Sequence, residues 1–197
     1  MTEENHWYDN TPGWILLYEE AFLEALARTL PENSKIINIG SAVGTSSSAI
    51  MRGVQHLDNV TVISIDVEDC PQELDMLKAR HLYDENRFFQ VQADSVMAAK
   101  EIDYELDMVF VDGSHSYKGT LADLEAYAPL LKPGGLMVCH DYMDPRQPEC
   151  SKAILDWIDW VEQEDGNWFC VGTVIYTAAF KKPGAGSAWH KGRLDYE

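Results

Sequence analysis

The chain has 197 residues, a net charge of −18 and an ordinary apolar content, which predicts one globular domain over residues 1–197. The acidic charge argues against nucleic acids and anionic membrane surfaces as partners, because both require clustered Lys and Arg. Neither a membrane-spanning apolar run nor the residue order of a signal peptide is found, so we expect a cytoplasmic protein. The four cysteines lack paired CxxC spacing, which favours reduced thiols.

Hydrophobic periodicity predicts the elements in chain order. An N-terminal arm and helix occupy residues 1–30, with a polar arm at 1–10, a helix start at Thr11 and Pro12, and a helix end at Pro31. Strands and helices then alternate. The expected strands are 36–39, 60–65, 87–91, 108–111 and 136–139, and the expected helices are 46–54, 71–82, a short one after Asp94, and 117–131.

The C-terminal part is expected to contain an amphipathic helix over 154–161 and a strand pair at 168–171 and 174–180. Gly172 and Thr173 would form the turn of this hairpin, and residues 183–197 would form a tail. A turn at Pro133-Gly134-Gly135 would lead into the strand at 136–139. Alternating strands and helices predict a mostly parallel sheet covered on both faces, and the final strand pair adds one antiparallel edge strand.

A glycine-containing loop follows the first expected strand and opens a helix. It reads Asn38-Ile-Gly40-Ser-Ala-Val-Gly44-Thr-Ser46. Glycines let the backbone turn sharply and approach a ligand, and a helix N-terminus favours an anion. The spacing differs from the GxGxxG of dinucleotide-binding proteins, and no Lys follows as in a P-loop. A cofactor loop and an ordinary tight turn are both compatible with these residues.

Carboxylates follow the second and third expected strands. Asp66 lies where a side chain can bind the two hydroxyls of a ribose, although a solvated Asp at a strand end is the alternative. Asp94 could accept a hydrogen bond from an adenine amino group or cap a helix, and these roles can coexist.

Four further polar groups follow two neighbouring strands: Asp112, His115, His140 and Asp141. Strand C-termini border the ligand crevice of an open α/β sheet, so these groups are expected to converge. Carboxylate oxygens suit Mg²⁺, and a nitrogen ligand from His140 would shift the preference toward Mn²⁺ or another transition metal. His115 could act as a general base. The alternative has Asp112 capping a turn and the histidines bonded to backbone.

Taken together, these motifs resemble class I S-adenosylmethionine-dependent methyltransferases. More narrowly, the chain resembles the metal-dependent O-methyltransferases, a group that contains catechol O-methyltransferase and the macrolide-sugar methyltransferases. The cephalosporin hydroxylase-like proteins share this pattern. The resemblance covers roughly residues 35–181 and is most specific from Val-Phe-Val-Asp112-Gly-Ser-His115 through Leu-Lys-Pro-Gly-Gly to His140-Asp141-Tyr142. It implies a Rossmann-like, doubly wound α/β sheet of seven strands in the order 3-2-1-4-5-7-6, with strand 7 antiparallel.

The resemblance also implies roles for individual residues. His115 would be the base, and Asp112, His140 and Asp141 would stand at metal-ligand positions. The chain departs from the family pattern at Asn38 and His140, where carboxylates are usual. The implied cofactor-binding residues are Gly40, Ser41, Ala42, Gly44, Ser46, Asp66, Ala93, Asp94 and Asp112.

The implied activity is methyl transfer from S-adenosylmethionine to a hydroxyl of a small acceptor, assisted by Mg²⁺ or Mn²⁺ and the His115 base. We expect no nucleic-acid or membrane partner, and assembly into a homo-oligomer stays open. The alternatives are an NAD-dependent oxidoreductase on a related sheet, a non-catalytic protein that binds S-adenosylmethionine, and a methyltransferase that needs no metal.

Overall fold

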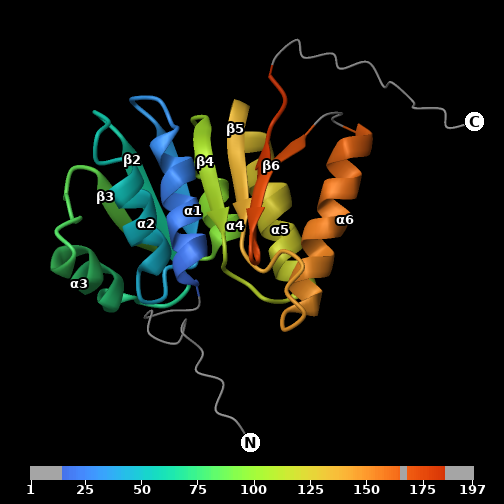
Figure 1. Cartoon of the computed structure of the whole chain (residues 1–197), viewed down its shortest axis with the longest axis horizontal. Helices are drawn as coiled ribbons and strands as arrows, with labels where there is room; N and C mark the ends of the chain where they lie inside the picture. The colour runs from blue at the N-terminus through green and yellow to red at the C-terminus, as the bar shows by residue number, and fades with distance from the viewer. Residues whose placement is uncertain (1–14, 165–167, 185–197) are drawn as a thin grey trace, which may run out of the picture.

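The computed structural model describes residues 15–164 and 168–184, which form a seven-stranded sheet between two layers of helices (Figure 1). The strands are β1 (Lys35–Ile39), β2 (Thr61–Asp66), β3 (Phe88–Gln92), β4 (Leu106–Val111), β5 (Leu131–Cys139), β6 (Phe169–Val174) and β7 (Thr177–Lys181). The helices are α1 (Leu17–Arg28), α2 (Thr45–Gly53), α3 (Pro71–Ala79), α4 (Ser95–Ala99), α5 (Tyr117–Tyr127), the 3₁₀-helix η1 (Ala128–Leu130) and α6 (Pro148–Glu164).

The strand order is β3-β2-β1-β4-β5-β7-β6, which confirms the expected topology. Strands β1 to β5 pair in parallel, whereas β7 is antiparallel to both β5 and β6. The antiparallel strand therefore lies inside the sheet, and β6 is the edge strand beside it. The residues alone had suggested an antiparallel strand at the edge.

Alternation along the strands builds a separate core on each face of the sheet. In β1, Ile36 packs against the layer of α1, α2 and α3, whereas Ile37 and Ile39 pack against the layer of α4, α5 and α6. Helices α1 and α2 lie in front of the sheet and α4 and α5 behind it (Figure 1). Because both faces are covered, the central strands are almost continuously apolar. The ends of the strands, rather than their faces, are left to carry polar groups.

Two loop predictions in the C-terminal half are wrong. The Pro133-Gly134-Gly135 segment lies within β5, where a register shift against β4 absorbs the residues expected to form a turn. The hairpin turns at Ile175 and Tyr176, after β6 has ended, and not at Gly172 and Thr173. Gly172 instead follows a register shift in β6, where a Cβ would lie 3.3 Å from the Phe22 ring. This glycine therefore serves close packing against α1.

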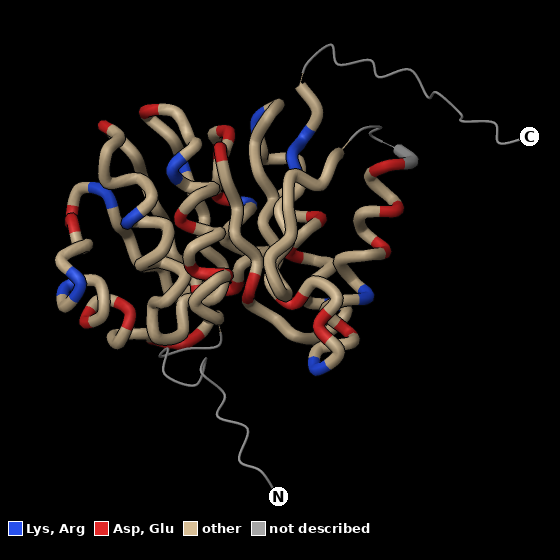
Figure 2. The backbone as a smooth tube through the Cα atoms, in the orientation of Figure 1, with Lys and Arg blue, Asp and Glu red and all other residues tan. Residues whose placement is uncertain are grey.

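Several expectations concern residues outside the described ranges: the arm at 1–10, the helix start at Thr11 and Pro12, and the tail from 185 onward. Within the described chain, no helix is both long enough and apolar enough to cross a membrane. The described cysteines carry no disulfide, and three of them are buried while Cys170 is exposed. Acidic positions outnumber basic ones along the backbone, and several lie where the central strands end (Figure 2).

Candidate functional site

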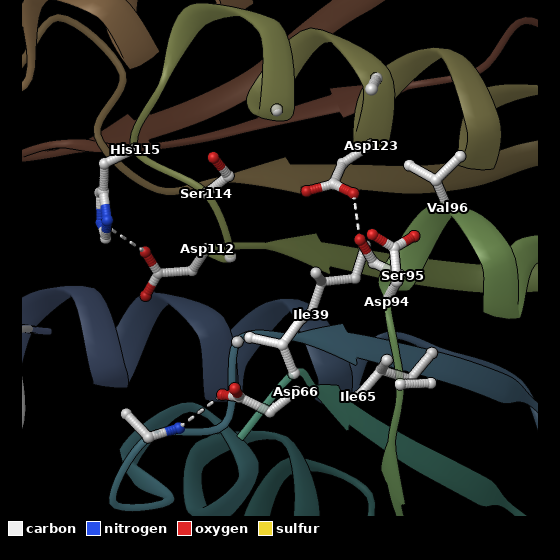
Figure 3. Close-up of a pocket in the computed structure, with 17 residues that line it drawn as sticks. Ile39, Ile65, Asp66, Asp94, Ser95, Val96, Asp112, Ser114, His115 and Asp123 are labelled. Carbon is white, nitrogen blue, oxygen red and sulfur yellow. Dashed lines mark hydrogen bonds and ion pairs between the residues drawn. The ribbon is translucent and has the colours of Figure 1, made fainter.

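A cavity of about 610 Å³ opens at the carboxyl ends of β1, β2, β3 and β4 (Figure 3). Apolar side chains form part of its wall, and acidic groups are spread along it. The predicted site residues that line it are Gly40, Ala42, Asp66, Ala93, Asp94, Asp112 and His115. The other five predicted residues do not line it. Ser41 bonds through its hydroxyl to Ser64 at 2.7 Å, Ser46 is buried, and Gly44 caps the N-terminus of α2. His140 and Asp141 are buried beside its Asp112 end.

The loop after β1 is held by its backbone against both neighbouring strands. The Gly40 amide donates to the Ile65 carbonyl at 2.9 Å, and the Asp112 amide donates to the Ile39 carbonyl at 3.0 Å. Gly40 has φ +89°, and a Cβ there would lie 2.1 Å from the Asp112 carbonyl oxygen. Only glycine fits this conformation and approach. The cavity floor therefore depends on the first glycine of the loop.

Replacing Gly40 by Ala is expected to lower stability by at least about 2 kcal/mol, because an alanine at positive φ is strained and its methyl would overlap a carbonyl. The melting temperature should fall by roughly 4–8 °C for a chain of this size. Gly184→Ala is the matched control, since nothing lies within 4 Å of the added Cβ. Thermal unfolding followed by circular dichroism measures both. Equal melting temperatures for the two variants would contradict this account of Gly40.

Asp66 ties the end of β2 to the same loop. Its Oδ2 accepts from the amides of Ser41 at 2.8 Å and Ala42 at 3.3 Å, and its Oδ1 accepts from Glu68 at 3.0 Å. Burial alone would raise the pKa of Asp66, but the three backbone donors lower it overall. Asp66 is therefore an ionised, oriented carboxylate on the cavity wall (Figure 3).

A buried polar network supports the loop from below. The Asn38 amide donates to the hydroxyls of Ser47 at 2.9 Å and Ser64 at 3.2 Å. Glu73, fully buried on α3, accepts from both of these hydroxyls and from Gln90 at 2.7 Å. A carboxylate thus lies beneath the loop although Asn38 stands at the expected acidic position. Sequence reasoning missed Glu73, because its burial depends on the packing of α3 against the strands.

Asp112, His115 and Asp141 come together at one end of the cavity. Neighbouring residues of β4 and β5 are paired there, with Val111 opposite Cys139. The His115 Nε2 lies 3.1 Å from Asp141 Oδ2 and 3.7 Å from Asp112 Oδ1. Ligand atoms of the three residues all lie within 4.8 Å of one another, a spacing that a divalent cation can bridge. Asp112 and Asp141 raise the pKa of His115 to about 10.

His140 lies beside this group, buried, and is not part of the set that meets the 4.8 Å spacing. Its Nδ1 lies 3.2 Å from Asp112 Oδ1 and 3.1 Å from Asp141 Oδ1, and its Nε2 lies 3.5 Å from Glu19 Oε2. These are ion-pair contacts, because neither ring nitrogen makes a well-formed hydrogen bond. Burial alone would lower the pKa of His140, but the carboxylates of Asp112, Asp141 and Glu19 raise it overall.

Glu19 was not anticipated as part of this region. It is buried on α1, and its Oε1 accepts from the Tyr176 amide at 2.9 Å and the Thr177 hydroxyl at 3.1 Å. Its Oε2 accepts from the Leu16 amide at 2.9 Å and faces His140. A metal-bound imidazole usually places its second nitrogen against a carboxylate, so this arrangement suits His140 as a ligand. The acidic residue in the first turn of α1 would have been read as a capping residue.

The geometry separates two ends of one cavity. Asp94 lies toward one end, Asp112 and His115 lie at the other, and Asp66 lies between them (Figure 3). Asp141 contacts His115 at that second end. Asp94 caps α4 by accepting from the Met97 amide at 2.9 Å, which is the capping role considered from sequence. Such a cavity can hold an elongated nucleoside ligand beside a pair of carboxylates that could bind a cation.

Comparisons with known proteins agree with this geometry. A family model described as a methyltransferase domain matches residues 37–142. A search of curated proteins finds no match. Among solved structures, an O-methyltransferase from Bacillus cereus in complex with SAH is similar at 17% identity and TM-score 0.65, over 89% of this chain and 84% of that one.

Two other solved structures share the fold. The O-methyltransferase TomG from Streptomyces achromogenes, in complex with SAM, has 19% identity and TM-score 0.65, over 84% of this chain and 80% of the other. An rRNA methylase from Streptococcus thermophilus has 13% identity and TM-score 0.62, over 82% of this chain and 94% of the other. At these identities the likeness shows a common fold and leaves the acceptor open.

Proposed function

Because this chain belongs to the family of methyltransferase domains, we propose that it transfers a methyl group from S-adenosylmethionine to a hydroxyl of a small acceptor. The observation that carries the proposal is one cavity with a ribose-type carboxylate at its centre and the Asp112, His115 and Asp141 group at one end. S-adenosylmethionine supplies an electrophilic methyl group at its sulfonium.

The chain's residues would hold the methyl donor at its ribose and at its amino-acid part. The Asp66 carboxylate is oriented by three backbone amides, two at Oδ2 and one at Oδ1, and Oδ1 has a lone pair left for a ribose hydroxyl. The glycine loop supplies close backbone approach for the amino-acid part of the donor. Asp112 stands between this loop and the acceptor end, since its backbone contacts the loop and its side chain faces His115.

The acceptor hydroxyl would lose its proton to His115 before attacking the methyl group. Asp112 and Asp141 fit a divalent cation, and their pairing with two imidazoles gives Mn²⁺ better support than Mg²⁺. A bound cation would lower the pKa of the acceptor hydroxyl. Positioning by these residues would contribute the rest of the rate enhancement, because a methyl transfer requires an in-line approach of the acceptor oxygen to the methyl group.

A small acceptor fits the charge of the chain better than a nucleic acid does. The net charge of −18 disfavours contact with a phosphate backbone, although solved structures of the same fold include rRNA methylases. The half-exposed His115 makes the acceptor end accessible to a molecule from solution. We therefore expect catalysis with hydroxylated small molecules and none with RNA.

Calorimetry with S-adenosylhomocysteine and NAD side by side tests the cofactor. We expect S-adenosylhomocysteine to bind and NAD not to bind. Asp66→Ala should weaken that binding by about tenfold or more, since it removes a charged hydrogen-bond partner. Asp69→Ala, an exposed neighbour, should not change it. Binding of NAD in preference to S-adenosylhomocysteine would favour an oxidoreductase. Binding without turnover over a panel of hydroxylated acceptors would favour the non-catalytic alternative.

A further inference from the structure

A second buried carboxylate faces the cavity at the end away from His115. Asp123 lies on α5 and its residue is 3% exposed, yet it lines the cavity. Its Oδ1 accepts from the Ser95 hydroxyl, and among the described residues no hydrogen bond reaches its Oδ2. Figure 3 shows this second oxygen directed into the cavity. This oxygen is not among the enclosed polar atoms that lack a partner, so it is open to the cavity, and a ligand that displaces water from it must supply a donor.

The direction of this carboxylate is fixed from several sides. Ser95 is held to α5 twice, by its contact with Asp123 and by the Tyr127 hydroxyl, which donates to the Ser95 carbonyl at 2.8 Å. Gly113 leaves room for the free oxygen, because a Cβ there would lie 3.4 Å from Asp123 Oδ2. Burial also raises the pKa of Asp123. Its free oxygen is therefore placed before any ligand arrives.

The position of Asp123 along the cavity indicates which part of the methyl donor it would contact. With the proposed ribose at Asp66 and the sulfonium toward Asp112, the base of the methyl donor would extend toward Ser95 and Asp123 (Figure 3). The apolar side chains of Ile65, Val67, Val96 and Ala122 also line the cavity and suit the flat faces of a purine. The exocyclic amino group is the hydrogen-bond donor on an adenine that is joined to a ribose.

We propose that Asp123 is the specificity-determining residue for the base: its Oδ2 accepts a hydrogen bond from the adenine amino group. This assignment rests on the proposed function. Asp94, the carboxylate considered for this role from sequence, is exposed and already caps α4. A solvated carboxylate discriminates weakly, because water replaces a lost partner. A buried one rejects a base that offers no donor.

The test compares two ligands that differ at one position of the base, S-adenosylhomocysteine and S-inosylhomocysteine, in which oxygen replaces the amino group. Calorimetry on the wild-type chain should favour the adenosyl compound by about 100-fold or more, as for a site that reads a polar group. In Asp123→Asn the Ser95 hydroxyl retains an oxygen acceptor, so the amide NH₂ faces the base. The preference should then fall by at least about tenfold and move toward the inosyl compound.

Asp69→Asn, at an exposed residue that does not line the cavity, is the matched control and should keep the wild-type ratio. Asp123→Ala removes the acceptor without adding a donor and should abolish the discrimination without reversing it. An unchanged ratio in both Asp123 variants, or an equal loss in Asp69→Asn, would overturn the assignment while leaving the proposed function in place. A wild-type chain that binds neither compound would overturn the proposed function and this assignment together.

Discussion

Replacing His115 by Ala is expected to lower kcat by about 10²–10⁴-fold, the range that a positioned general acid or base contributes. The side chain is 46% exposed and contacts the proposed acceptor end, so its loss should not disturb folding or the binding of S-adenosylhomocysteine. Release of S-adenosylhomocysteine with an accepted hydroxyl compound measures the rate, and calorimetry measures the binding. The control is His56→Ala, which removes an exposed histidine that does not line the cavity.

The protonation state of His115 adds a second test of its role as the base. Asp112 and Asp141 raise the pKa of His115 to about 10, so the imidazole is cationic at neutral pH while both carboxylates are unshielded. A cationic imidazole cannot accept a proton. The base role therefore requires a counter-charge at the two carboxylates, and chelation by EDTA should reduce turnover as His115→Ala does. Unchanged turnover in His115→Ala would remove the base assignment. Full activity in EDTA would favour the metal-independent enzyme.

Much of the fold was predictable because local pattern and tertiary role coincide in the central strands. Ile36 to Ile39 and Met108 to Val111 are short apolar runs that end in Gly40 and Asp112, and the structure places strands there. The errors lie where a tertiary contact decides the backbone. The sequence predicts Gly172 in a turn, but its place in β6 depends on the Phe22 ring of α1.

The site shows the same division between local and tertiary information. Asp66, Asp112 and Asp141 could be grouped from sequence, because parallel strands end at one edge of a sheet. Glu19 and Asp123 reach the region from helices, where burial depends on how each helix packs. No spacing rule links Glu19 to His140, more than a hundred residues away in the sequence, although Glu19 Oε2 and His140 Nε2 lie 3.5 Å apart. The supporting shell of a site is therefore harder to predict than its strand-end residues.

Asp141→Asn should weaken Mn²⁺ binding by at least about 100-fold, because loss of a direct ligand should exceed the 10–100-fold effect of outer partners. Asp141 lies between two imidazoles, with His115 Nε2 and His140 Nδ1 each 3.1 Å from its oxygens. Burial alone would raise the pKa of Asp141, but the two histidines lower it overall. Asn keeps the shape and tolerates the left-handed conformation at φ 60°, whereas Ala would add strain.

The backbone of Asp141 should also survive the change, since the Ser151 hydroxyl at the start of α6 donates to its carbonyl at 2.8 Å. Electron paramagnetic resonance of free Mn²⁺ measures the affinity, with Asp75→Asn as the control on an exposed part of α3. Three carboxylates, from Glu19, Asp112 and Asp141, surround the two imidazoles, so a divalent cation and protonated histidines are alternative counter-charges. If Asp141→Asn bound Mn²⁺ as the wild type does, Asp141 would not be a metal ligand, and protonated His115 and His140 would be its counter-charges instead.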